Sequence, residues 1–206
     1  MQIPPVSQIR RMEAAVKLAE GKFMRQKGMR KLPSGWHAFS TSAPRNARYQ
    51  ATPPCVLLYK LDELTLPREY HLADLGSGLG MACFAASLYF DRVTGFELDP
   101  AVLAGAEKVK KELEINNVTF ENQNFLKADL TRYNVLYIFH PLMEGFIMHT
   151  SQKMQELKPG TIVLANLIEF ARRDIFDPFS FKLLDGQGQR ASSSSALNCI
   201  YAFERR

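Results

Sequence analysis

A glycine-rich run, Asp-Leu-Gly-Ser-Gly-Leu-Gly at residues 74–80, constrains the fold more than any other part of the sequence. The apolar stretch 71–75 leads into it and is typical of a buried parallel strand, and residues 81–90 have the composition of a helix. The glycines allow a turn tight enough for a ligand to approach the backbone. A second apolar stretch ends at Glu97, whose carboxylate can hold two ribose hydroxyls. The sequence therefore predicts a strand–loop–helix–strand unit that binds an adenosine-containing cofactor.

The spacing of the glycines indicates which cofactor binds. A dinucleotide-binding loop, G-x-G-x-x-G, needs a small residue three places after its second glycine. Counting from the first glycine, that place holds Met81, and counting from the second it holds Cys83. The observed D-x-G-x-G-x-G instead resembles motif I of S-adenosylmethionine-dependent methyltransferases. That cofactor has no pyrophosphate, so we expect the loop to contact its methionyl part and Asp74 to accept hydrogen bonds near its ammonium group.

Length and composition indicate one domain with a sizeable core and an appendage. The chain has 206 residues, 46% of them hydrophobic, and no apolar run approaches the ~20 residues that span a bilayer. Its three cysteines are widely spaced without a C-x-x-C pair, and its four histidines lack metal-ligand spacing. We therefore expect a cytoplasmic protein with reduced thiols, no membrane segment and no bound metal.

Basic residues are concentrated at the start of the sequence. Residues 1–50 carry ten Lys and Arg against two Glu, a net charge of +8, whereas the remainder carries sixteen against nineteen, a net of −3. One explanation is a solvated face that serves only solubility. The other is an arm that attracts an acidic partner, either nucleic acid phosphates or an acidic protein surface. We divide the chain into a basic N-terminal helix and connector, 1–50, and a cofactor-binding domain, 51–206.

Periodicity predicts an α/β fold with a doubly wound sheet. Ser7 is expected to cap an amphipathic N-terminal helix that extends to Phe23, and Thr52 to cap a helix that follows it. Strands are expected at 71–75, 93–97, 118–121, 133–139, 161–167, 181–184 and 198–203, and helices between them at 81–90, 100–113 and 144–157. The last two strands lack a connecting helix. We therefore expect a Rossmann-like sheet of seven strands, mostly parallel with an antiparallel C-terminal hairpin, plus an N-terminal helical extension.

Five segments together resemble the seven-strand protein-lysine methyltransferases. This branch includes mitochondrial enzymes that modify the ATP synthase c-subunit and the adenine nucleotide translocase. The segments are Tyr49-x-Ala51-Thr52-Pro53, the glycine run 74–80, Gly95-Phe-Glu97-Leu-Asp-Pro100, Asn124-Phe125-Leu126, and the apolar run 133–139 followed by a proline. The resemblance covers about residues 49–167. It implies S-adenosylmethionine as cofactor and in-line methylation of a lysine on a protein substrate.

The resemblance also implies roles for individual residues. Thr52 would lie near the carboxylate of the cofactor, and Asn124, where the family often has Asp, would accept a hydrogen bond from the adenine amino group. Phe125 would pack on the adenine face or simply belong to the core. The expected cofactor-binding residues are Thr52, Asp74, Gly76, Ser77, Gly78, Gly80, Glu97, Leu98, Asn124 and Phe125.

The segment after the fourth expected strand, 139–143, departs from related enzymes. Methyltransferases that act on amino groups of bases or glutamine usually carry Asn/Asp-Pro-Pro-Tyr/Phe there, and His140 stands at the first of these positions. A neutral imidazole can accept a proton or a hydrogen bond from the substrate nitrogen. A histidine at a strand end can equally be a satisfied polar group. His140 and Tyr49 are the candidate catalytic residues.

Other functions stay open on the sequence alone. An RNA or small-molecule acceptor would use the same cofactor site, and the basic arm favours RNA, whereas the missing Asn-Pro-Pro-Tyr argues against base amino groups. A non-catalytic, methyltransferase-like scaffold that acts through its arm would tolerate the altered positions 124 and 140. The leading hypothesis is an S-adenosylmethionine-dependent protein-lysine methyltransferase.

Overall fold

The computed structural model describes residues 5–26, 52–139, 144–166, 176, 180–184 and 200–206. In these parts the chain forms a seven-stranded sheet with the order β3-β2-β1-β4-β5-β7-β6. The strands are β1 His71–Leu75, β2 Arg92–Phe96, β3 Val118–Glu121, β4 Val135–Phe139, β5 Ile162–Asn166, β6 Phe181–Leu183 and β7 Ile200–Arg205. The first five run parallel, and β7 is antiparallel to both β5 and β6. The predicted Rossmann-like sheet is therefore confirmed.

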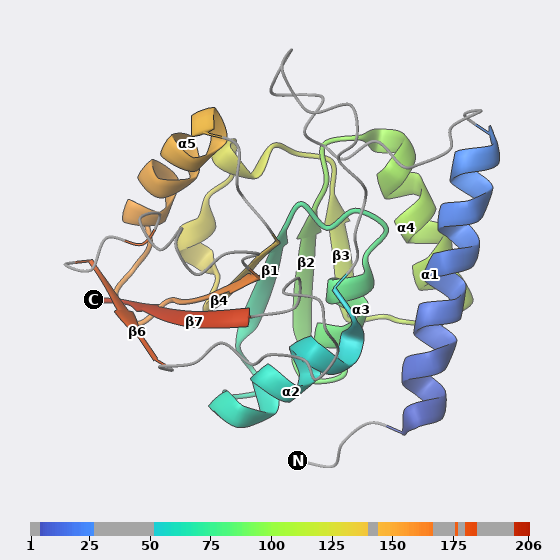
Figure 1. Ribbon diagram of the computed structural model, residues 1–206, viewed down its shortest axis with the longest axis horizontal. Coiled ribbons are helices and arrows are strands. Elements are labelled where there is room, and N and C mark those ends of the chain that lie inside the picture. Colours follow the sequence, from blue (N-terminus) through green and yellow to red (C-terminus); the bar gives the residue numbers. More distant parts are fainter. Residues whose placement is uncertain (1–4, 27–51, 140–143, 167–175, 177–179, 185–199) are drawn as a thin grey trace.

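Helices pack on both sides of this sheet, with α1, α3 and α4 on one side and α5 on the other (Figure 1). The helices are α1 Val6–Gln26, α2 Pro54–Leu64, α3 Met81–Ala86, α4 Pro100–Glu112 and α5 Glu144–Gln155, and two 3-10 helices are η2 Phe125–Lys127 and η3 Leu130–Arg132. One hydrophobic cluster joins the sheet to the first four helices, and a second joins it to α5. Among the helices of the described segments, none has the length and apolarity needed to cross a bilayer.

The N-terminal helix α1 contributes to the core of the domain. Met12 and Val16 are buried against the layer that contains α3 and α4, whereas Arg11 and Lys17 are exposed. The guanidinium group of Arg11 donates a hydrogen bond to the carbonyl oxygen of Glu112, at the end of α4, at 3.1 Å. The helix therefore lies on the body of the protein with an exposed basic side, as its sequence pattern predicts.

Two predicted helix caps are wrong. Helix α1 begins at Val6, which places Ser7 inside its first turn. Helix α2 begins at Pro54 with Pro53 in the N-cap position. The Thr52 hydroxyl is instead hydrogen-bonded to side chains of β4 and β5. These partners are far away in the sequence, so a local capping pattern does not reveal them.

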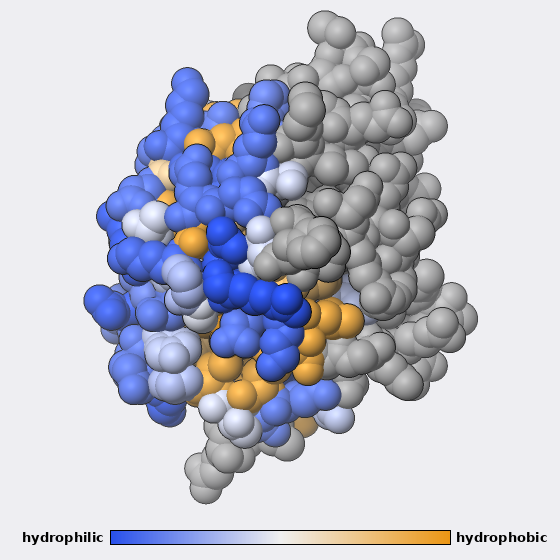
Figure 2. Space-filling model, turned by 90° about the vertical axis from the view of Figure 1, so that its left-hand side faces the viewer, coloured by the Kyte–Doolittle hydropathy of each residue, from blue (hydrophilic) through white to orange (hydrophobic). Residues whose placement is uncertain are grey.

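Figure 2 shows the side of the molecule on which α5 lies, where most of the described surface is hydrophilic. On this side, Arg205 at the end of β7 contacts the neighbouring elements. Its guanidinium group donates to the carbonyl oxygens of Ser180 at 2.9 Å and Gln155 at 3.4 Å, and lies over the ring of Phe181. These contacts connect the last strand of the sheet to both β6 and α5.

We expect Gly80→Ala to lower the free energy of unfolding by about 2–5 kcal/mol, as measured by denaturant unfolding. Gly80 has a φ of +86°, and an added Cβ would lie 2.7 Å from the ring of Phe120 and 2.8 Å from that of Phe84. The variant would therefore combine left-handed backbone strain, about 1–2 kcal/mol, with overpacking, about 1–3 kcal/mol.

Gly160→Ala is the matched control for this experiment. Gly160 has a similar φ, +84°, but no atom lies within 4 Å of the position that its Cβ would take. The free energy of unfolding of this variant should fall only by the cost of backbone strain, about 1–2 kcal/mol. Equal losses in the two variants would contradict a packing role for Gly80.

Candidate functional site

The candidate site lies at the carboxyl ends of β1 and β2, beside the point where the strand order reverses. The chain passes from β1 to β2 on one side and reaches β4 on the other, so the loops that follow β1 and β4 diverge. Such a switch point is the usual ligand position in open parallel sheets. In Figure 1 it is the upper edge of the sheet. Asp74, Ser77 and Glu97 all lie at this edge and are buried.

The glycine loop that follows β1 is attached to the neighbouring strand. The N–H groups of Gly76 and Ser77 donate hydrogen bonds to the carbonyl oxygen of Phe96 at 3.0 and 2.8 Å. Gly76 has a φ of +94°, and an added Cβ would meet no atom within 4 Å. Space beside Gly76 is therefore open to a ligand, whereas the space beside Gly80 is filled by aromatic rings.

The carboxylate of Glu97 joins this loop to the start of α4. Its Oε2 accepts a hydrogen bond from the N–H of Gly78 at 3.0 Å, and its Oε1 accepts one from the N–H of Asp99 at 2.8 Å. Asp99 in turn caps α4 by accepting from the N–H of Ala101 at 2.8 Å, as the sequence predicts. A carboxylate has about four acceptor positions, so the group keeps capacity to accept from a ligand hydroxyl beside its bonds to the backbone.

Asp74 places a buried carboxyl group beside the glycine loop. The thiol of Cys83, on α3, donates a hydrogen bond to its Oδ2 at 3.3 Å. Burial raises the pKa of Asp74 to about 7, and the charge of Glu97 adds to this, whereas the bond from the thiol lowers it. A cation beside Asp74 would favour the ionised form. The ammonium group of the expected cofactor fits that requirement.

The hydroxyl of Ser77 provides a test of whether the loop fits a polar ligand. Its Oγ is buried and has no hydrogen-bond partner among the described residues. A buried polar group without a partner costs about 1–3 kcal/mol, so a ligand that bonds to it is favoured. Ser77 follows Gly76, whose backbone faces open space. Together they fit the amino-acid end of S-adenosylmethionine, which the sequence assigns to this loop.

A neutral polar cluster lies on the β4–β5 side of the switch point, and sequence reasoning missed most of it. The Thr52 hydroxyl is hydrogen-bonded to the hydroxyl of Tyr137, and the Nδ2 of Asn166 donates to Thr52 Oγ1 at 3.2 Å and to Tyr137 Oη at 3.5 Å. All three residues are buried. Burial raises the pKa of Tyr137, which keeps its hydroxyl protonated at neutral pH. Tyr137 belongs to the apolar run 133–139 of the family resemblance but was predicted only as part of a strand, and Asn166 lies in none of the resembling segments.

The predicted adenine and ribose contacts beyond Glu97 lie after β2 and β3. Asn124 accepts a hydrogen bond from the N–H of Leu126 at 3.0 Å and so caps η2. Phe125 is buried in the cluster shared with α5, and Leu98 is 38% exposed. The contacts of these three residues with a cofactor stay predictions.

The two candidate catalytic residues, Tyr49 and His140, lie outside the described residues. Phe139, which precedes His140, is half-buried at the end of β4. It is paired with Asn166 of β5. The end of β4 is therefore adjacent to the neutral polar cluster.

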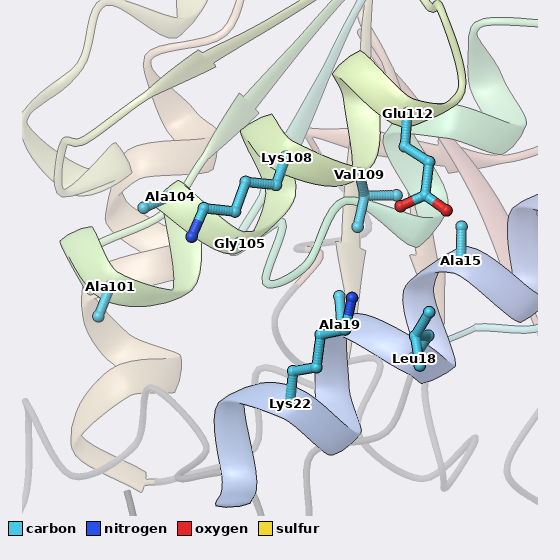
Figure 3. Close-up of a pocket in the computed structure, with 10 residues that line it drawn as sticks. All are labelled: Ala15, Leu18, Ala19, Lys22, Ala101, Ala104, Gly105, Lys108, Val109 and Glu112. Atoms are coloured by element: carbon cyan, nitrogen blue, oxygen red, sulfur yellow. The ribbon is translucent and has the colours of Figure 1, made fainter. Parts of the chain in front are cut away.

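A pocket of about 130 Å³ lies elsewhere, between α1 and α4 (Figure 3). Most of its lining is small or apolar and consists of Ala15, Leu18, Ala19, Ala101, Ala104, Gly105 and Val109. Three charged side chains complete the lining: Lys22, Lys108 and Glu112. None of them belongs to the predicted cofactor-binding set. The pocket is therefore separate from the candidate site.

A family model described as the ANTKMT methyltransferase domain matches residues 74–175. The matched segment begins at Asp74 and includes the glycine loop, Glu97 and the end of β4. A search of curated proteins found no match.

Several solved structures share the fold. An RNA methyltransferase from Salinibacter ruber in complex with S-adenosyl-L-homocysteine is 22% identical, with a TM-score of 0.59 over 76% of this chain and 94% of that one. A tRNA methyltransferase from Aquifex aeolicus is 16% identical, with a TM-score of 0.58 over 78% and 71%. A magnesium protoporphyrin IX methyltransferase from Synechocystis with bound S-adenosylmethionine is 15% identical, with a TM-score of 0.59 over 74% and 77%.

We expect the ligand-free protein to lose stability, relative to Asp74→Asn, as the pH rises from about 4 to about 7. A carboxyl group with a pKa of about 3.9 in the unfolded chain and about 7 in the folded protein binds its proton more tightly when folded. Its stabilising contribution is complete below the lower value and is lost as the pH approaches the higher one. Urea unfolding of both proteins across this range measures the effect. Parallel stability curves would contradict the raised pKa.

Proposed function

We propose that this protein, which is a class I S-adenosylmethionine-dependent methyltransferase with a seven-stranded sheet, methylates lysine side chains of a protein substrate. Its cofactor is S-adenosylmethionine, in agreement with the bound cofactor or product in two of its structural neighbours. The observation that supports a protein lysine is the match of residues 74–175 to the ANTKMT domain model. The name of that model agrees with the lysine-methyltransferase branch that the sequence resembles.

We propose that the cofactor lies across the carboxyl ends of β1 and β2. Glu97 would accept hydrogen bonds from the ribose hydroxyls beside its bonds to the backbone of Gly78 and Asp99. Gly76 and Ser77 would contact the amino-acid end, and Asp74 would lie near its ammonium group. The other contacts proposed from the sequence are those of Thr52, Gly78, Gly80, Leu98, Asn124 and Phe125.

The chemistry requires mainly that the chain bind and orient the acceptor. When bound, the cofactor supplies a methyl group on a positively charged sulfur, activated for in-line transfer. A free lysine has a pKa of about 10.4, so its ammonium group must lose a proton before the nitrogen can attack. Phe139, at the end of β4, offers apolar surface that favours the neutral amine. We propose that His140 accepts the departing proton and that Tyr49 lines the acceptor channel.

We expect the wild type to transfer tritiated methyl from S-adenosylmethionine into the protein fraction of a host-cell lysate, and Glu97→Gln to do so at least about tenfold more slowly. Glutamine replaces one acceptor oxygen with an amide nitrogen, which cannot accept a ribose hydroxyl or a backbone N–H. Binding of S-adenosyl-L-homocysteine, measured by calorimetry, should weaken in parallel. Circular dichroism checks that the variant is folded.

The nature of the labelled fraction decides the acceptor class. Label that protease removes and ribonuclease leaves supports a protein substrate. Label that ribonuclease removes would move the acceptor to RNA. The absence of Glu97-dependent label from both fractions would contradict the proposal, and would favour a small-molecule acceptor or a non-catalytic scaffold.

RNA is the second candidate acceptor, and the basic side of α1 favours it. Arg10, Arg11 and Lys17 are exposed there, and they would attract an acidic partner, either RNA or an acidic protein surface. Removal of the whole helix would also remove Met12 and Val16 from the core. Substitution of the exposed charges is therefore a cleaner test than deletion.

We expect the double variant Arg10→Gln, Lys17→Gln to raise the KM for the labelled acceptor severalfold at low salt, because attraction between exposed charges is strongest there. The dissociation constant of S-adenosyl-L-homocysteine should stay unchanged. Lys158→Gln combined with Lys182→Gln removes the same charge from exposed positions outside α1 and serves as the control. An equal rise of the KM in both double variants would show a general charge effect and contradict a role for α1.

A cytoplasmic location is proposed from the thiol chemistry. Cys55 is exposed and Cys83 is buried, and both are free thiols. Free thiols are usual where the surroundings are reducing.

A further inference from the structure

Asn166 holds a buried amide whose two ends have different environments. It is the last residue of β5, and its side chain is 1% exposed. The Nδ2 end donates hydrogen bonds to Thr52 and Tyr137, which fix the orientation of the amide. The Oδ1 end has no hydrogen-bond partner among the described residues. Because an unpaired buried carbonyl group costs free energy, a ligand with an N–H or O–H donor would be favoured beside it.

The position of Asn166 assigns it to the acceptor side of the site. Neighbouring strands lie about 4.8 Å apart, and β5 is three strands from β2 in the order β2-β1-β4-β5, a separation of roughly 14 Å. The Nδ2 of Asn166 is bonded to Tyr137, whose pairing partner on β1 is Asp74, so the amide lies beside the methionine end of the proposed cofactor, which carries the methyl group. Asn166 is also paired with Phe139, the last residue of β4.

We propose that Asn166 Oδ1 accepts a hydrogen bond from an N–H of the acceptor amine and so directs the nitrogen lone pair toward the methyl group. The inference rests on the proposed function in one respect, that the acceptor is an amine. In the transfer, the nitrogen forms the new bond to the methyl carbon, the carbon–sulfur bond breaks with its electron pair on sulfur, and the amine proton leaves to a base or to water. Asn166 binds and orients the amine and takes no proton.

A neutral acceptor atom suits this task better than a carboxylate. A carboxylate beside a lysine would stabilise the ammonium form and raise the pKa of the amine. The amide oxygen accepts the N–H bond without adding a negative charge. The neighbouring hydroxyls of Thr52 and Tyr137 are neutral as well. The raised pKa of Tyr137 keeps its hydroxyl protonated and therefore uncharged.

The test compares Asn166→Leu, which removes the amide at similar volume, with Asn166→Asp, which keeps an oxygen at the same place. Methyl transfer from tritiated S-adenosylmethionine to total protein of a host-cell lysate gives apparent kcat and KM, and calorimetry gives the dissociation constant of S-adenosyl-L-homocysteine. We expect the leucine variant to lose roughly 10- to 100-fold in kcat/KM. The dissociation constant should rise by a clearly smaller factor, because Asn166 also holds Thr52, a proposed cofactor contact. The aspartate variant should recover most of the loss at high pH, where the amine is neutral.

Thr150→Val is the matched control. Thr150 lies on α5, on the other side of the sheet, and its buried hydroxyl also lacks a partner among the described residues. Its replacement should leave kcat/KM and cofactor binding unchanged. Thermal unfolding of all three variants separates a loss of fold from a loss of the N–H bond.

Three outcomes would overturn the inference. Wild-type kcat/KM in the leucine variant would show that Oδ1 has no role in transfer. Equal losses of kcat/KM and of S-adenosyl-L-homocysteine binding would place Oδ1 against the ammonium group of the cofactor. Unfolding of both Asn166 variants would make the residue structural. If the label appears in RNA and still depends on Asn166, the proposal of a lysine substrate fails, but the proposed hydrogen bond from Asn166 to the acceptor amine survives. The two proposals can therefore fail separately.

Discussion

The site depends on the bridging carboxylate of Glu97. Its hydrogen bonds to the backbone of Gly78 and Asp99 join the loop after β1 to the first turn of α4. Helix α4 in turn supports α1, whose Arg11 bonds to the other end of α4. The same two oxygens are the atoms proposed to hold the ribose hydroxyls. One buried group therefore positions the cofactor loop, orients a helix and offers the ligand contacts, so any change to it affects all three.

The edge of the sheet separates charged groups from neutral ones. The carboxyl groups of Asp74 and Glu97 lie on the β1–β2 side, where a cofactor with an ammonium group and a positive sulfur is proposed to bind. The uncharged side chains of Thr52, Tyr137 and Asn166 lie on the β4–β5 side. A lysine must arrive there without its proton. The distribution therefore matches the charge of each proposed ligand, and the two groups meet where β1 pairs with β4, at Asp74 and Tyr137.

Local patterns predicted the elements well because apolar residues recur with one period in strands and with another in helices. The strand 71–75 and the cap of α4 by Asp99 follow from adjacent residues, and the structure confirms both. The cap by Thr52 was wrong because its hydroxyl bonds to Tyr137, 85 positions away. Asn166 had no signal, because it lies in none of the segments that resemble a known motif. What sequence reasoning misses are contacts that exist only once the sheet has formed.

The last strand has a consequence for the way the chain is made. β7 lies between β5 and β6, although both precede it in the chain. During synthesis the outer edge of β5 therefore has its backbone N–H and C=O groups unpaired until residues 200–205 leave the ribosome. A nascent chain stalled before that point would carry the cofactor loop but also an open strand edge, which is a template for pairing with other chains. A chain truncated before residue 200 would thus keep the residues of the cofactor loop but leave this edge of β5 open.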